Sequence, residues 1–196
     1  MLNNETNKKR DAELVVKSLN NKDAFAEIIS CYELALRRYL VRLGCRDTHD
    51  IEDLLQEIFL KVYVNLNEFE PELQFSSWIY RIAHNEAVSF FRKKNIRPVT
   101  VTTEEDLQIF TNIADEGDFV QLLNDHMNVE IFRIALTQLE VQHRDVLVLR
   151  FLENKDYAEI SDILKIPIGT VGTAINRGKK LLRDSIMAKI SKSSLV

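Results

Sequence analysis

The sequence predicts an all-α fold in which two small helical domains are joined by a flexible acidic linker. Only five glycines and three prolines occur in 196 residues, too few for a turn-rich β protein. Apolar residues recur at spacings of three and four along most of the chain, as on the buried face of a helix. This periodicity stops between residues 98 and 127, where acidic side chains dominate. We therefore expect a first domain at 1–97, a linker at 98–127 and a second domain at 128–196.

Three long helices are expected in the first domain. Segment 23–43 places apolar residues such as Phe25 and Leu36 on one stripe, and Gly44 suits the end of a helix. A second amphipathic helix follows from Asp47 to Leu66, and a third from Phe75 to about Lys94.

The second domain begins where regular periodicity returns, at 129–152. Within the preceding linker, one short helix is expected after Thr103, whose side chain can cap it. Ala158–Leu164 then predicts a short helix, and a turn at Lys165–Pro167 leads into a longer one from Gly169. A short helix, a tight turn and a second basic helix are the layout of a helix-turn-helix.

Composition excludes several classes of protein. No run of about 18 apolar residues occurs, so membrane insertion is not expected. The N-terminus lacks the apolar core of a signal peptide, and two cysteines (Cys31 and Cys45) fit a reduced, cytoplasmic chain. The four histidines lie far apart in the sequence, and no catalytic constellation or phosphate-binding loop stands out. The sequence therefore predicts no metal site, no cofactor and no enzymatic activity.

Charge is segregated along the chain, although the net charge is only −4. Residues 1–97 are balanced, 98–136 carry eight acids against one arginine, and 137–196 carry ten basic side chains against seven acids. Two basic clusters therefore flank an acidic connector, which indicates two anion-binding modules or, equally, solvated helix ends.

The second helix of the helix-turn-helix has two distinct faces. Val171, Ile175, Gly178 and Leu182 are spaced to pack inward, which leaves the opposite face free to read a major groove. An ordinary helical hairpin with a basic outer face is the alternative. The residues expected to contact DNA here are Thr170, Thr173, Asn176, Arg177, Lys179 and Lys180.

The segment 75–94 combines aromatic and basic side chains. Five of the 16 aromatic residues of the chain lie between positions 75 and 91. Stacking aromatics and nearby cations are what single-stranded DNA requires, although core packing would explain Phe75, Phe90 and Phe91. The residues expected to contact DNA here are Trp78, Tyr80, Arg81, Asn85, Arg92, Lys93 and Lys94.

The helix at 47–66 carries a polar edge formed by Asp53, Gln56 and Glu57, at spacings i, i+3 and i+4. Without further evidence, the simplest interpretation of this polar edge is a face of the helix exposed to solvent.

Three motifs in order resemble the bacterial sigma-70 family, in its short extracytoplasmic-function (ECF) group. They are DLLQEIF at 53–59, FSSWIYRIAHN at 75–85, and IPIGTV at 166–171 followed by Arg177. The resemblance runs from about Asp23 to Asp184 and leaves out the termini and the linker. It implies a promoter-specificity subunit that binds core RNA polymerase, recognises the −35 and −10 elements and begins strand opening.

The resemblance also assigns partners and roles. Asp53, Gln56 and Glu57 would dock on the β′ clamp helices, and the β flap is a further implied contact. The stretch from Trp78 to Asn85 would open the −10 element, with Asn85 reading a flipped base, and the helix after Pro167 would read the −35 element. An anti-sigma factor is the other implied partner.

The sequence departs from the family pattern at Gly172 and Ala174, where basic residues are common, so fewer −35 contacts are expected. This departure keeps open a sigma mimic that sequesters an anti-sigma factor. A stand-alone helix-turn-helix regulator is the other alternative, but it would need neither the aromatic helix nor the docking edge.

Overall fold

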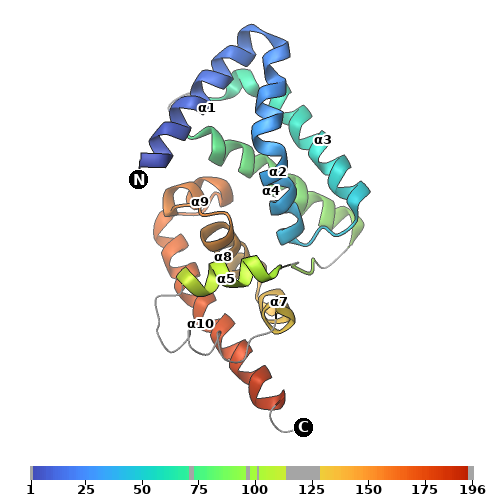
Figure 1. Ribbon diagram of the computed structural model, residues 1–196, viewed down its shortest axis with the longest axis vertical. Helices are drawn as coiled ribbons and strands as arrows, with labels where there is room; N and C mark the ends of the chain where they lie inside the picture. The colour runs from blue at the N-terminus through green and yellow to red at the C-terminus, as the bar shows by residue number, and fades with distance from the viewer. Residues whose placement is uncertain (1, 71–72, 96–97, 101, 114–128, 194–196) are drawn as a thin grey trace. The chain divides into compact units, whose positions relative to one another are not determined.

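The computed structural model describes residues 2–70, 73–95, 98–100, 102–113 and 129–193, and within these residues it contains helices and no strand. The described elements are α1 (Leu2–Asn20), η1 (Lys22–Ala24), α2 (Phe25–Leu43), α3 (Thr48–Val64), η2 (Leu66–Glu68), α4 (Phe75–Lys94), α5 (Glu104–Ile113), α7 (Val129–Gln138), α8 (Val141–Leu147), the π-helical turn η3 (Val148–Leu152), α9 (Tyr157–Leu164) and α10 (Ile168–Ser193) (Figure 1). The all-α prediction is confirmed.

The chain divides into two compact units. The first comprises residues 1–41, 45–97 and 162–165, and the second comprises 42–44, 98–161 and 166–196. Most of the acidic segment expected to act as a linker, residues 114–128, lies outside the described residues.

In the first unit, α3 packs along α4, and α1 packs on α4 and η2 (Figure 1). Asp47 begins α3, since its carboxylate accepts hydrogen bonds from the backbone N–H groups of His49 and Asp50, at 2.9 and 3.1 Å. Asn95 ends α4 in the left-handed conformation, at φ 54°, which asparagine tolerates better than most residues. The predicted bounds of the third long helix, 75 to about 94, are those observed.

Helix α1 was not expected from the sequence, because the side chains that it buries are not an apolar stripe. Asp11, Val15 and Ser18 are buried on its inner face, so two of the three are polar. The Tyr32 hydroxyl of α2 donates a hydrogen bond to the Asp11 carboxylate. Burial, and then the charge of Asp11, raise the pKa of Tyr32 far above its ordinary value, so this phenol remains a donor at physiological pH.

In the second unit, α10 packs against α8 and α7, and α5 packs against η3 and α7. The helix predicted after Thr103 is present as α5, and it opens with reciprocal hydrogen bonds. The Thr103 backbone N–H donates to the Asp106 carboxylate at 3.0 Å, and the Asp106 N–H donates to the Thr103 hydroxyl at 3.2 Å. Because α5 packs on α7 and η3, the start of the predicted linker is part of the second unit.

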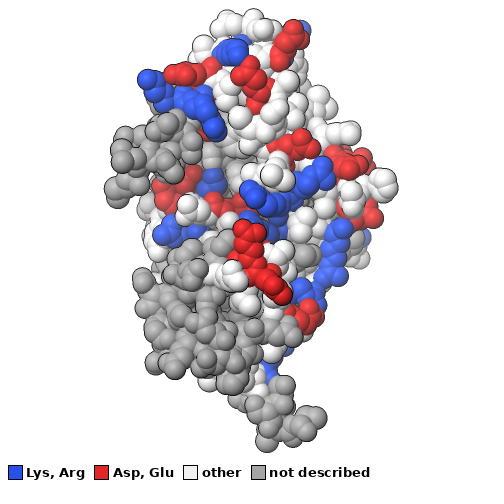
Figure 2. Space-filling model, viewed as in Figure 1, with Lys and Arg blue, Asp and Glu red and all other residues white. Residues whose placement is uncertain are grey.

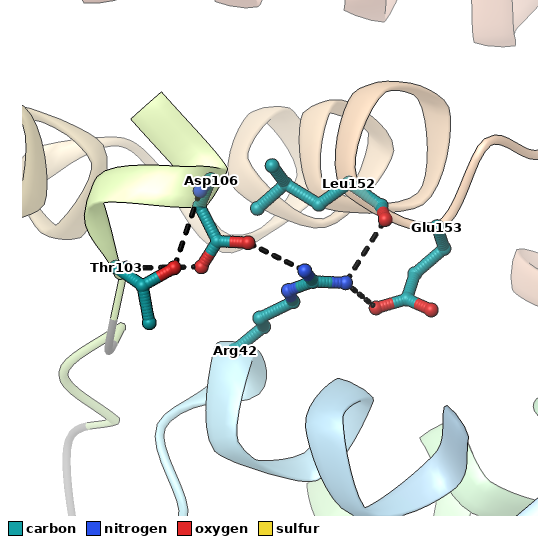
Figure 3. Close-up of polar contacts among 5 residues, drawn as sticks. All are labelled: Arg42, Thr103, Asp106, Leu152 and Glu153. Atoms are coloured by element: carbon teal, nitrogen blue, oxygen red, sulfur yellow. Dashed lines mark hydrogen bonds and ion pairs between the residues drawn. The ribbon is translucent and has the colours of Figure 1, made fainter. Parts of the chain in front are cut away.

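A buried arginine connects three segments of the second unit (Figure 3). The Arg42 guanidinium donates to the Asp106 carboxylate, to the Glu153 carboxylate at 2.7 Å and to the Leu152 carbonyl at 2.9 Å. Burial lowers the pKa of Arg42, but Glu153 and then Asp106 raise it by more, so its net shift is upward. The side chains of Asp106 and Glu153 are only 4% and 5% exposed, so Arg42 neutralises two buried carboxylates at once.

Replacing Arg42 is expected to destabilise the protein. In Arg42→Met the methylene stem is retained, but two buried carboxylates lose their cation, a loss of about 3–5 kcal/mol in the free energy of unfolding. Urea denaturation followed by circular dichroism measures this change. Arg38→Met, at an exposed position of α2, is the matched control and should change the free energy by less than about 0.5 kcal/mol. Equal stability of the two variants would contradict the role given to Arg42.

Candidate nucleic-acid interface

The outer face of α10 presents the polar residues that the sequence predicted there. Thr170, Thr173, Asn176 and Arg177 are exposed along one side of the helix. The Thr173 hydroxyl donates back to the Gly169 carbonyl at 3.0 Å, which leaves its methyl group outward. Lys180 is also exposed and Lys179 is half-buried. The structure therefore brings all six predicted residues of α10 to its solvent side.

The inner face of α10 packs as the spacing predicted. Val171, Ile175 and Leu182 are at most 3% exposed. Gly178 lies so close to α8 that a Cβ atom there would come within 3.2 Å of the His143 carbonyl and of Leu147. Glycine at 178 is therefore what allows α8 and α10 to approach.

The two departures from the family pattern, Gly172 and Ala174, differ in how deeply they are buried. Ala174 is 9% exposed and belongs to the core, so a basic side chain at this position of this helix would not lie on its DNA-facing side. Gly172 is half-buried beside the Tyr157 ring, and a Cβ atom there would make an ordinary contact at 3.4 Å. Only Gly172 is therefore a place where an outward cation is missing.

A basic groove on α10 extends beyond the residues that the sequence singled out. It is lined by Asn176, Lys179, Lys180, Arg183, Asp184 and Met187. Arg183 lies one helical turn beyond Lys179 and Lys180 and is exposed. The basic tract at 166–192 was visible in the sequence, and the same spacing could have indicated Arg183.

On α4, the predicted DNA-contacting residues fall into two groups. Asn85, Arg92, Lys93 and Lys94 are exposed, and Arg81 is half-buried. In contrast, Trp78 and Tyr80 are only 9% and 5% exposed. The structure therefore does not place these two rings on the surface that carries Arg81 and Asn85, and in this conformation they cannot stack on a base.

Trp78 and Tyr80 are buried because other rings pack on them. Trp78 lies against Phe69 and Phe75, with ring centroids 5.5 and 5.6 Å apart. Tyr80 lies against Tyr39 of α2 at 5.1 Å. Aromatic pairs at these separations add to the stability that ring burial provides. The alternative of core packing, weighed for Phe75, Phe90 and Phe91, holds for Phe75 and Phe91, whereas Phe90 is half-buried.

Two ion pairs join α4 to α3. Lys61 donates to Glu86 at 2.6 Å, and Lys94 donates to Asp50 at 2.6 Å. The Lys94 ammonium also lies 4.8 Å from the centroid of the Phe90 ring. Because Lys94 is held in this way, Arg92 and Lys93 are the better placed of the basic cluster to meet a phosphate.

The polar edge predicted on α3 is solvent-exposed in full, at Asp53, Gln56 and Glu57. Two apolar side chains continue it along the helix, since Leu60 and Val64 are 63% and 65% exposed. Exposed aliphatic residues beside a polar edge indicate a surface for a partner protein. The sequence pattern predicted neither a buried position nor a binding role for Leu60 and Val64.

A groove lies between α2 and α3, next to this edge. Its lining residues are Phe25, Ile29, Glu33, Arg37, Glu52, Leu55, Gln56, Phe59, Leu60 and Tyr63. The lining is mainly apolar with charged margins, a composition typical of the surface that receives a helix of another protein.

Charge on the face drawn in Figure 2 is mixed, with Lys and Arg side chains interspersed among Asp and Glu. Local clusters of basic side chains lie at the end of α4, at Arg92, Lys93 and Lys94, and in the groove on α10. Among the described residues, no group of three or more His, Cys, Asp or Glu side chains could hold a metal ion. Within the same residues no helix is both long enough and apolar enough to cross a membrane.

Comparison with known families identifies both units. Residues 28–96 match the model of sigma-70 region 2, and residues 130–182 match that of sigma-70 region 4. The chain is 32% identical over 173 residues to the ECF RNA polymerase sigma factor SigW of Bacillus subtilis, covering 85% of this chain and 90% of SigW.

The chain belongs to the sigma-70 family, in its ECF group. It is 30% identical over 173 residues to the ECF sigma-E factor of Haemophilus influenzae, covering 85% of this chain and 89% of that relative. As a sigma factor it directs transcription initiation and is not an enzyme. The region 2 match excludes a stand-alone helix-turn-helix regulator, because such a protein would have no region 2.

Two solved structures share the fold. CnrH, determined in complex with the cytosolic domain of CnrY, superposes with a TM-score of 0.65 at 20% identity, covering 91% of this chain and 97% of CnrH. RpoE of Bartonella quintana, determined in complex with the anti-sigma factor NepR, gives a TM-score of 0.59 at 20% identity, covering 83% of this chain and 96% of RpoE.

Two of the three glycines of α10, Gly172 and Gly178, give a matched pair of predictions for region 4. Gly178→Ala should destabilise the protein by about 1–3 kcal/mol, because the backbone carbonyl of His143 cannot move away from the new methyl group. Gly172→Ala should be neutral or stabilise by up to about 1 kcal/mol, since alanine favours the helix and the methyl group has room. Urea denaturation of both variants tests this contrast, and the reverse order of stability would contradict the packing described.

Proposed function

We propose that this ECF sigma factor divides its tasks among three exposed helical faces. The polar edge of α3 binds core RNA polymerase, the face of α4 with Arg81 and Asn85 contacts the −10 element, and the outer face of α10 reads the −35 element. One observation supports the proposal most strongly. The exposed faces of α3 and α4 lie in the sequence that matches sigma-70 region 2, and the exposed face of α10 lies in the sequence that matches region 4. The family implies a cytoplasmic location, where core polymerase transcribes.

At the −35 element, α10 offers side chains of known base preference. Asn176 has the geometry to pair with adenine and Arg177 with guanine in a major groove. Lys179, Lys180 and Arg183 in the basic groove supply phosphate contacts, which position the helix but carry no sequence information. With glycine at 172, base reading depends on residues 173, 176 and 177.

At the −10 element, Arg81, Asn85 and Arg92 form one strip along α4. Unstacking a base costs a few kcal/mol, and contacts that exist only with the separated strand must offset this cost. Asn85 is suited to hydrogen bond a flipped base, and Arg92 with Lys93 to hold the adjoining backbone.

Core polymerase docking is supported by the chemistry of the α3 surface. Asp53 and Glu57 carry negative charge, Gln56 lies both on this edge and in the groove, and Leu60 adds apolar area. The same surface is a candidate site for an anti-sigma factor, because occupying it would exclude the polymerase. The complex of RpoE, which shares the fold, with the anti-sigma factor NepR supports such a partner.

Charge reversal at the docking edge tests the polymerase contact. The double variant Asp53→Lys, Glu57→Lys should bind purified core polymerase at least about tenfold more weakly, because a charge-complementary interface becomes repulsive. Fluorescence anisotropy of labelled protein measures the affinity. Glu13→Lys, at an exposed position of α1, is the control for added positive charge. Unchanged affinity in the double variant would contradict the docking assignment.

Substitutions on α10 should separate base reading from phosphate contact. Arg177→Ala is expected to cost about 1–3 kcal/mol on the cognate −35 duplex and to relax the preference at one base pair. Lys180→Ala should weaken binding to all sequences equally and lower the slope of log affinity against log salt by about one. Binding titrations of the holoenzyme at several salt concentrations measure both effects. A uniform loss in Arg177→Ala would contradict its role in base reading.

A further inference from the structure

The burial of Trp78 and Tyr80 leaves the DNA-facing side of α4 without the aromatic rings that the sequence assigned to it. His84 lies on that side and was not assigned a role. It is half-buried, so the core does not enclose it fully. At 100° per residue, Arg81, His84, Asn85 and Arg92 lie within roughly a third of the helix circumference.

The His84 ring is held in place by a side chain from α2. Its Nδ1 atom is 3.0 Å from the hydroxyl of Tyr39, and the ring centroids are 6.4 Å apart with an interplanar angle of 30°. Tyr39 is itself fully buried and packs on Tyr80, so it has little freedom to move. A hydrogen bond from an immobile partner fixes the plane of the imidazole and lowers the entropy cost of a contact on its exposed part.

We propose that His84 is a further DNA-contacting residue, whose imidazole stacks on an unpaired base of the −10 element, and that Tyr39 is its positioning residue. This inference rests on the proposed function of α4. An imidazole offers a flat π-face for an unpaired base, as do the larger aromatic side chains. Arg81 and Asn85 flank His84 on the helix, so the stacked base would adjoin the one that Asn85 reads.

Stacking requires a flat ring at position 84, whereas hydrogen bonding requires the ring nitrogen atoms. A phenylalanine preserves the flat ring and loses the nitrogen atoms, whereas an alanine loses both. His84→Phe should therefore retain most of the contribution that His84→Ala removes. Tyr39→Phe keeps the buried ring but loses the hydroxyl, so it should weaken binding less than His84→Ala.

The test uses holoenzyme reconstituted with core polymerase and fork-junction DNA from a promoter selected by run-off transcription. The single-stranded −10 segment carries 2-aminopurine, whose fluorescence reports stacking. We expect His84→Ala to bind this DNA at least about fivefold more weakly and to lose the fluorescence change. His84→Phe should remain within about threefold of the parent protein, and Tyr39→Phe should fall about two- to fivefold.

His49→Ala, which removes an exposed histidine at the start of α3, is the matched control and should bind as the parent does. Binding of each variant to core polymerase and to fully duplex −35 DNA checks that its fold is intact. His84→Ala binding as tightly as His49→Ala would overturn the proposal, and so would a His84→Phe variant as defective as His84→Ala. If the parent holoenzyme binds fork-junction and duplex DNA equally, the proposed function of α4 fails, and the inference fails with it.

Discussion

The packing of aromatic rings on the inner face of α4 is the constraint on which region 2 depends. Tyr80 packs against Tyr39 and, together with Ala83 and Ala87, forms the side of α4 that turns inward. Because side chains on a helix are fixed at 100° intervals, burying this side turns Arg81 and Asn85 outward, while Phe69 covers Trp78. The core of this unit thereby sets the orientation of the surface that we propose contacts DNA.

In region 4, a small residue determines how the helices pack. Gly178 allows α8 to approach α10 closely, and Val171, Ile175 and Leu182 complete the buried face. The outer side chains then project from a helix whose rotation is settled by packing. Arg42, which lies in the sequence matched to region 2 but belongs to the second compact unit, offsets the buried charges of Asp106 and Glu153. Each surface proposed to contact DNA is thus backed by a packed interior.

Much of this arrangement could be predicted from the sequence, because apolar periodicity reports which helices bury a stripe. The bounds of α4 and the inner face of α10 followed from it, whereas the helix after Thr103 followed from a side chain that can cap it. Helix α1 did not, since two of its buried side chains, Asp11 and Ser18, are polar and therefore interrupt an apolar periodicity. The sequence also could not distinguish a stacking tryptophan from a core tryptophan, because Trp78 is buried by Phe69, which lies in a preceding loop. Tyr39 and His84 are 45 residues apart, so only the fold reveals that they are partners.

The central claim is that this sigma factor reads two separated promoter elements with α10 and α4 while bound to core polymerase. Run-off transcription with purified core polymerase on a pool of genomic promoter fragments, with and without the protein, tests it most directly. The account predicts a discrete set of protein-dependent transcripts whose start sites are preceded by two motifs at constant spacing. Core binding without any such transcripts, or transcripts that share no upstream motif, would contradict it.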